Sequence, residues 1–126
     1  MKIYTQNERE MIQYIVELLS TFDEAFVHIN LQVDELRLEE SHMLFKDTIE
    51  ALEVVVASSV VLLVDQCGMD MIQCMGTMRE ALTQTIDAYE EGNIVSIKWA
   101  LEKRLLPAFH QWRDAINLLL IPTIAS

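Results

Sequence analysis

The stretch from residue 5 to residue 36, TQNEREMIQYIVELLSTFDEAFVHINLQVDEL, carries the strongest structural pattern in the chain. Its first four residues, Thr5-Gln6-Asn7-Glu8, match a capping box, in which each end residue's side chain accepts a hydrogen bond from the other's amide. Apolar residues then recur in steps of three and four, which places them on one helix face: Met11, Ile15, Leu18, Phe22, Phe26 (or Ala25), Ile29, Val33 and Leu36. This spacing predicts a first helix from near Gln6 into the low thirties.

A second apolar stripe follows out of phase, because continuing the first would bury Glu40 and Asp47. Its members are Phe45, Ile49, Leu52, Val56, Val60, Leu63 and Cys67. We therefore expect a turn between Leu31 and Glu39 and a second helix that starts by Ser41. Gly68 is expected to end this helix in the left-handed conformation that glycine adopts most easily.

Two further helices are predicted on either side of Glu91-Gly92-Asn93, where Gly92 suits a helix end and Asn93 a helix start. The third helix, with Asp70 as its N-cap, carries Met71, Met75, Met78, Leu82, Ile86 and Tyr89 on one face. The fourth carries Ile94, Ile97, Leu101, Leu105, Ala108, Trp112, Ala115 and Leu119. Proline disrupts a helix interior, so we expect a kink or break at Lys103 to Leu106, before Pro107, and an end at Pro122.

Four amphipathic segments with short links predict an all-α protein, an antiparallel up-down-up-down four-helix bundle. The 126 residues amount to one domain, 1–126. Only three glycines and two prolines occur, which argues against a fold of many strands and turns.

The chain is acidic, with 20 acidic and 9 basic residues and a net charge of -11. Such a surface repels phosphate backbones and anionic lipids, so we expect neither nucleic acid nor a membrane as a partner. The longest apolar run, from Val54 to Val64, is too short to span a bilayer. No signal-peptide pattern opens the sequence, which favours the cytoplasm, where Cys67 and Cys74 stay reduced.

Motifs for chemistry are sparse. There is no Gly-x-Ser-x-Gly elbow and no glycine-rich phosphate loop, so we expect neither an enzyme nor a cofactor. Glu39-Glu40-Ser41-His42 contains one Glu-x-x-His motif, whereas a di-iron bundle uses two such motifs and further glutamates. The alternative hypothesis is a metal-dependent enzyme or metal store that uses His28, His42 and Glu39 or Glu24, with His110 farther along the chain.

Two apolar regions are candidate partner-binding surfaces. Met69 begins a cluster with Met71, Met75 and Met78, and flexible thioether side chains suit adaptable binding. At helical spacing Met71, Met75 and Met78 fit a core, which leaves Met69 as the exposed member. The tail offers Leu118, Leu120, Ile121 and Ile124, and Trp99 and Trp112 on the same helix would strengthen such a surface. In the alternative interpretation, all of these side chains close the core.

One segment resembles a known family. It comprises Ala88-Tyr89-Glu90-Glu91-Gly92-Asn93, then Leu101-Glu102, then Leu105-Leu106-Pro107-Ala108-Phe109 and Trp112. This segment is similar to the C-terminal half of small, uncharacterised helical proteins from Firmicutes. The chain departs from that pattern at Lys103-Arg104, where an aromatic and an acidic residue are usual. The resemblance implies two helices joined at Gly92 and brings no activity with it.

The sequence thus favours a non-catalytic helical protein that binds another protein or itself. A specific version is a cytoplasmic chaperone or adaptor, such as those that hold export substrates in flagellar secretion. That version rests on analogy of fold rather than on a site.

Overall fold

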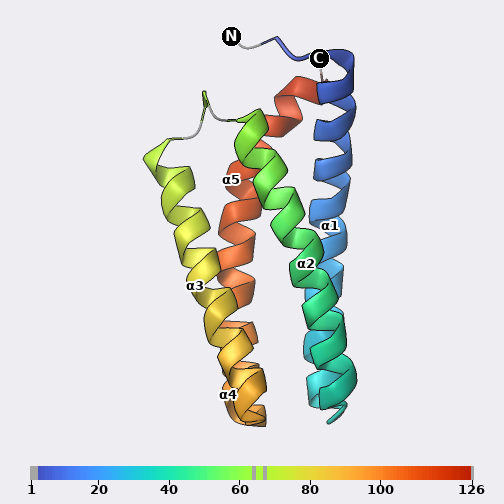
Figure 1. Ribbon diagram of the computed structural model, residues 1–126, viewed down its shortest axis with the longest axis vertical. Helices are drawn as coiled ribbons and strands as arrows, with labels where there is room; N and C mark the ends of the chain where they lie inside the picture. The colour runs from blue at the N-terminus through green and yellow to red at the C-terminus, as the bar shows by residue number, and fades with distance from the viewer. Residues whose placement is uncertain (1–2, 64, 67, 126) are drawn as a thin grey trace.

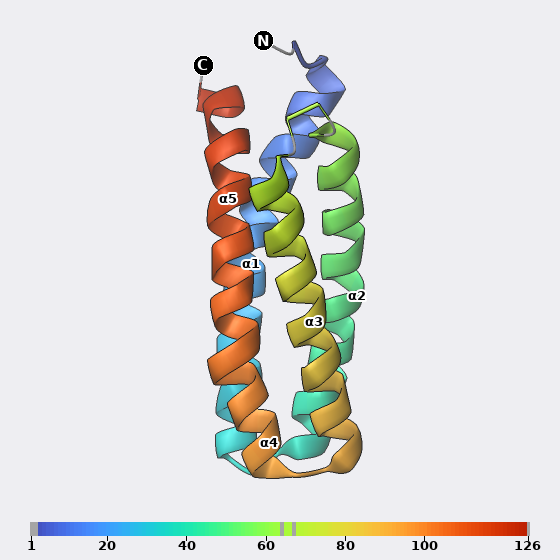
Figure 2. The ribbon, with the colours of Figure 1, turned by 90° about the vertical axis from the view of Figure 1, so that its left-hand side faces the viewer.

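The computed structural model describes residues 3–63, 65–66 and 68–125, with side chains up to residue 122. Its elements are α1 (Gln6–Asp34), α2 (Leu38–Leu62), α3 (Met69–Glu91), α4 (Ile94–Trp99), the π-helix η1 (Ala100–Leu105) and α5 (Leu106–Ala125). The last three follow one another without a gap and form one long helix. Successive long helices run in opposite directions (Figures 1 and 2), so the predicted all-α four-helix bundle is confirmed.

The first helix begins as the sequence predicts. The Thr5 hydroxyl accepts from the Glu8 amide at 3.1 Å, and the Thr5 amide donates to the Glu8 carboxylate at 2.9 Å. Helix α1 ends at Asp34 and α2 starts at Leu38, within the expected turn. Two members of the predicted stripe are wrong. Leu36 lies exposed in the turn with a φ of 63°, and Met11 is exposed because its neighbour Ile12 takes the buried position.

The junction between α2 and α3 differs from the prediction. Helix α2 ends at Leu62, and Gly68 is the N-cap of α3 with an extended φ of −95°. Gly68 therefore starts a helix rather than ending one, and Asp70 lies in the first turn of α3 instead of capping it. An acidic residue in a first turn interacts favourably with the positive end of the helix dipole. Cys67, placed in the second stripe, lies outside the described residues.

The turn at Gly92 is confirmed. Gly92 has a φ of 70°, and its amide donates to the carbonyls of Ala88 and Tyr89. The Asn93 side chain then caps α4 by accepting from the Ser96 amide at 3.2 Å.

The two prolines of the last helix behave differently from each other. The irregularity expected before Pro107 is the π-helix η1, whose wider turn lets the Leu106 amide donate to the Leu101 carbonyl, five residues back. Pro122 lies inside α5, so the prediction that it ends the helix is wrong. Its fixed φ is helical, and its ring removes only the bond to the Leu118 carbonyl close to the helix end.

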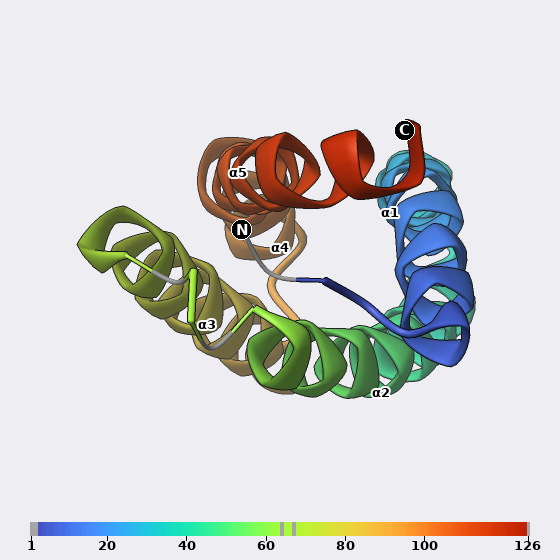
Figure 3. The same ribbon diagram turned by 90° about the horizontal axis from the view of Figure 1, so that it is seen from above.

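The helices form a ring around the core, and its loose side is the one between α2 and α3. Seen from above, α1, α2, α3 and α5 follow one another around the ring, and the start of α3 stands away from its neighbours (Figure 3). Helix α1 packs along α2 and α5, and α3 packs along α5 and η1, whereas α2 and α3 hardly approach each other. Val60 of α2 and Ile86 of α3, both predicted core residues, are each 36% exposed as a result.

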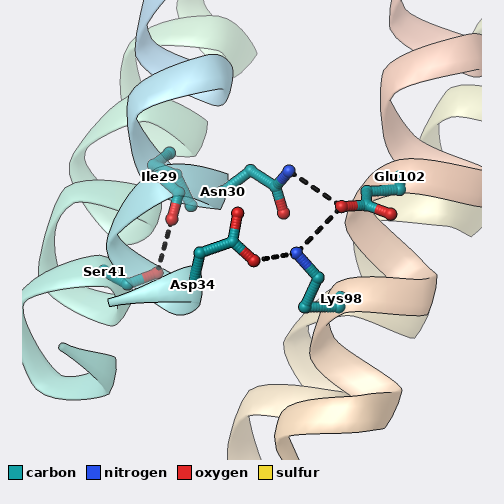
Figure 4. A network of polar contacts seen from close by, with 6 residues as sticks. All are labelled: Ile29, Asn30, Asp34, Ser41, Lys98 and Glu102. Carbon is teal, nitrogen blue, oxygen red and sulfur yellow. Dashed lines mark hydrogen bonds and ion pairs between the residues drawn. The ribbon is translucent and has the colours of Figure 1, made fainter. Parts of the chain in front are cut away.

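A polar network ties α1 to the start of the last helix (Figure 4). The Asn30 amide donates to the Glu102 carboxylate at 3.0 Å, and Lys98 pairs with Glu102 at 3.0 Å and with Asp34. The bonds to Asp34 and Glu102 raise the pKa of Lys98, while the bonds from Asn30 and then Lys98 lower the pKa of Glu102. The ion pairs of Lys98 are partly exposed, so the network fixes the position of the helices more than it adds stability.

Across the described residues, no helix combines the length and the apolar character that a bilayer span needs.

Alanine substitutions at two glycines test the backbone conformation at each position, and we expect them to change the stability of the protein in opposite directions. We expect Gly92→Ala to destabilise the protein by about 1–2 kcal/mol, because a Cβ is costly at positive φ. Gly76 lies inside α3, and a Cβ there would meet nothing within 4 Å. Gly76→Ala should therefore stabilise by roughly 0.5–1 kcal/mol. Urea unfolding of both variants measures the change in the free energy of unfolding. Changes in the same direction would contradict the conformations described for Gly92 and Gly76.

Candidate functional site

The loose side of the bundle holds an apolar groove between α2 and α3. Its volume is about 400 Å³. The α2 wall consists of Ile49, Leu52, Glu53, Val56 and Ala57, and the α3 wall of Met78, Arg79, Leu82, Thr83 and Ile86. Leu52, Val56, Met78 and Leu82 are buried core residues, so the floor of the groove is the flank of the core itself. A cleft of this kind, apolar with a few polar groups at its edges, is the usual form of a binding site.

Apolar side chains continue beyond the groove toward the end where α2 finishes and α3 begins. Val61 of α2 and Met69 and Ile72 of α3 are all exposed there. The prediction that Met69 is the exposed member of the methionine cluster is confirmed. Met78 and Met71 belong to the core, and Met75 is half-buried against it.

The other predicted partner-binding residues do not form one surface. Trp112 is 0% exposed and packs with Phe109, so its prediction as a surface anchor is wrong. Trp99 is 49% exposed under the Arg104 guanidinium, 4.7 Å from its ring centre. It ends α4, at the end of the bundle opposite the start of α3 (Figure 1). Trp112 is buried because it sits one turn after Phe109, on the face of α5 that meets α1.

The C-terminal surface is a helix face rather than a cleft. Leu118 and Ile121 are exposed, whereas Leu120 is buried. The hollow beside them is lined by Asp114, Asn117, Leu118, Ile121 and Pro122, all from α5. The side chain of Ile124 lies outside the described part of the chain. With a single helix as its wall, this region offers less enclosure to a partner than the groove does.

The histidines lie apart from any cluster of ligands. Among the described residues, no three His, Cys, Asp or Glu side chains gather closely enough to hold a metal ion. His110 shares a hydrogen bond with Asp23 at 2.6 Å, and His28 is exposed on α1. The metal-binding alternative that uses His28, His42 and Glu39 or Glu24 receives no support from this arrangement.

His42 instead belongs to a small polar cluster between α2 and α3. Its ring stacks on Tyr89 with 4.8 Å between centres and 6° between planes. The Tyr89 hydroxyl is hydrogen-bonded to the Ser41 hydroxyl, which donates to the Ile29 carbonyl at 3.3 Å. Burial raises the pKa of Tyr89, against the effect of the Ser41 bond.

The cluster connects α2 with α3 and α1, and its side chains are not arranged as a nucleophile and a base. Burial, and then the charge of Lys46, lower the pKa of His42, and Glu90 opposes them. His42 contacts Tyr89 by its ring face, so it is not positioned as a base for the Ser41 hydroxyl. Since Ser41 and Tyr89 are buried and bonded to each other, neither is presented to a substrate.

The groove is the feature that sequence reasoning missed. Periodicity assigns residues to an inner face but does not report the distance between two helices. The one available signal is on α2, where the run from Val54 to Val64 is apolar nearly all round and extends beyond a single stripe.

The pH dependence of stability tests the His42 assignment. A lowered pKa of His42 in the folded state means that the unfolded chain takes up the proton more readily. The contribution of the neutral His42 ring to the free energy of unfolding is therefore complete above about pH 6.5 and is lost as the pH falls below it. We expect the melting temperature of the wild type to fall more steeply between about pH 7 and pH 5 than that of His42→Gln. His28→Gln, at an exposed position, is the matched control. Equal slopes for wild type and His42→Gln would refute the assignment.

Comparison with known proteins leads to one family. No curated protein and no solved structure matches the chain. A family model described as "Domain of unknown function (DUF8042)" matches residues 10–115. The resemblance of residues 88 to 112 to an uncharacterised family is thereby extended over most of the sequence. The chain belongs to the family with the domain of unknown function DUF8042.

Proposed function

We propose that this protein binds an α-helical segment of another protein in the groove between α2 and α3, without catalysing a reaction. The single observation that supports this most is the groove itself, where two long helices leave the flank of the core uncovered. Helix-in-groove recognition uses such a surface, with apolar anchors at successive turns of the bound helix.

The size of the groove limits what it can bind. Its wall on α2 extends from Ile49 to Ala57 and that on α3 from Met78 to Ile86, each about 12 Å long at 1.5 Å per residue. This length matches two to three turns of a helix. A bound helix would therefore place about three anchor side chains on the floor.

Those anchors give a modest affinity on their own. Burying one Leu-sized side chain contributes about 1.5–3 kcal/mol, so three contribute roughly 5–9 kcal/mol. Association costs at least about 4 kcal/mol, which leaves a Kd on the order of 0.1 mM or weaker. The exposed apolar residues beyond the groove, Val61, Met69 and Ile72, supply further contact area for a longer partner.

A function of this kind suits a cytoplasmic chaperone or adaptor that holds another protein transiently, as in flagellar export. A weak to moderate affinity allows release, which such a role requires. The assignment to the cytoplasm and to this class is part of the proposal and rests on the acidic helical-bundle character of the chain. Self-association through the same groove is the competing outcome.

Two alanines of α2 provide a matched test. Ala57 lines the groove, whereas Ala51 is exposed on the same helix outside it. We expect Ala57→Trp to fill the groove and abolish capture of partner proteins from a lysate of the native organism. Ala51→Trp should capture the same proteins as the wild type. The readout is quantitative mass spectrometry of material retained on immobilised protein, with circular dichroism to show that both variants fold.

Capture that persists unchanged in Ala57→Trp would refute the groove as the binding site. Loss in a Leu118→Glu variant instead would move the site to the C-terminal face of α5.

A further inference from the structure

We infer that the helix bound in this groove carries basic residues along the flank that faces α2. The inference rests on the proposed function and specifies the chemistry of the partner. It starts from the two charged residues that line the groove, Glu53 on α2 and Arg79 on α3. Within the described residues, neither side chain forms an ion pair or hydrogen bond. Both charges thus border an apolar surface without a partner in the part of the chain that the structure describes.

The two helices that form the groove are strongly acidic as a pair. Across α2 and α3 there are ten acidic residues and two basic ones, Lys46 and Arg79, a net charge of −8. This charge attracts a cationic partner over distance and speeds its encounter. The net charge of the two helices would repel an acidic helix, except near Arg79.

Shape and charge both argue against a second copy of this chain as the occupant. Two grooves placed face to face are both concave, so their floors cannot touch. Each copy would also bring the acidic α2–α3 pair against its equivalent, which costs binding energy. A convex helix with a cationic flank fulfils both requirements.

The charges also set the direction in which the helix lies. Among the residues that line the groove, Glu53 is the charged residue on the α2 side and Arg79 the charged residue on the α3 side. A helix with Lys or Arg on one flank and Asp or Glu on the other fits in one orientation. Turning it end for end would place like charges against both walls.

The experiment uses two designed peptides of about 18 residues, each helical for roughly 27 Å. Both carry leucines at three successive turns. In the first, lysines border the leucines, and in the second, glutamates occupy the same positions. Binding to the full-length protein is measured by fluorescence anisotropy up to millimolar protein, at low salt.

We expect the lysine peptide to bind about fivefold more tightly than the glutamate peptide, since one ion pair at a partly exposed site contributes about 1 kcal/mol at most. Raising the salt should reduce the difference, because it screens exposed charges. Glu53→Lys should weaken the lysine peptide by about fivefold and Arg79→Glu should strengthen it. Glu24→Lys, on α1 outside the groove, changes the net charge by the same amount as Glu53→Lys and should have less than about half its effect on the binding free energy.

The outcomes separate this inference from the proposed function. If both peptides bind equally and Ala57→Trp abolishes both, the groove is the site and the charge inference is overturned. If Glu24→Lys acts as strongly as Glu53→Lys, attraction is not local to the groove and the inference fails. If neither peptide binds, or light scattering shows a dimer that Ala57→Trp dissociates, the inference and the proposed function fail together.

Discussion

The contact between the aromatic rings of α1 and α5 is the interaction on which the arrangement of the bundle depends. Phe109 of α5 meets Phe26 at 5.2 Å and Phe22 at 6.4 Å, edge to face, and Trp112 packs beside it. Edge-to-face pairs of this kind add about 0.5–1.5 kcal/mol beyond the area they bury. The pair α1–α5 thus forms one layer of the bundle, with α2 packed along α1 and α3 packed along α5 on the same side of it (Figure 3).

This arrangement explains why the groove lies where it does. Helix α2 is held by α1, and α3 is held by α5 and η1, so neither depends on the other along most of its length. They meet mainly where Tyr89 contacts Ser41, His42 and Phe45. From that junction to the end of α2 and the start of α3 the two helices hardly approach each other, and the flank of the core between them stays uncovered.

The sequence contains enough information to predict the elements and their caps, but not how the helices are spaced. Thr5, Gly92 and Asn93 could be interpreted correctly because each acts through bonds to residues a few positions away. Gly68 could not, because its role depends on where α2 ends, six residues earlier, and local propensity allows both roles. Periodicity does separate the two tryptophans: Trp112 belongs to the apolar stripe predicted for the fourth helix and is buried, whereas Trp99 lies outside that stripe and is 49% exposed.

The π-helix has a consequence for the rotational phase of the last helix. Ile97, Leu101, Leu105 and Phe109 follow in three steps of four, and all four are buried. In a regular α-helix each such step overshoots the turn by about 40°, so the three together would carry Phe109 roughly 120° away from Ile97. The wider turn of η1 absorbs this drift and returns Phe109 to the inner face. Removing one residue from Ala100–Leu105 would leave eleven steps between Ile97 and Phe109, about 1,100° of regular winding, which is within about 20° of three full turns. The shortened helix would therefore keep its aromatic face on α1 without the wider turn, so η1 accommodates one residue more than a regular helix could carry in phase.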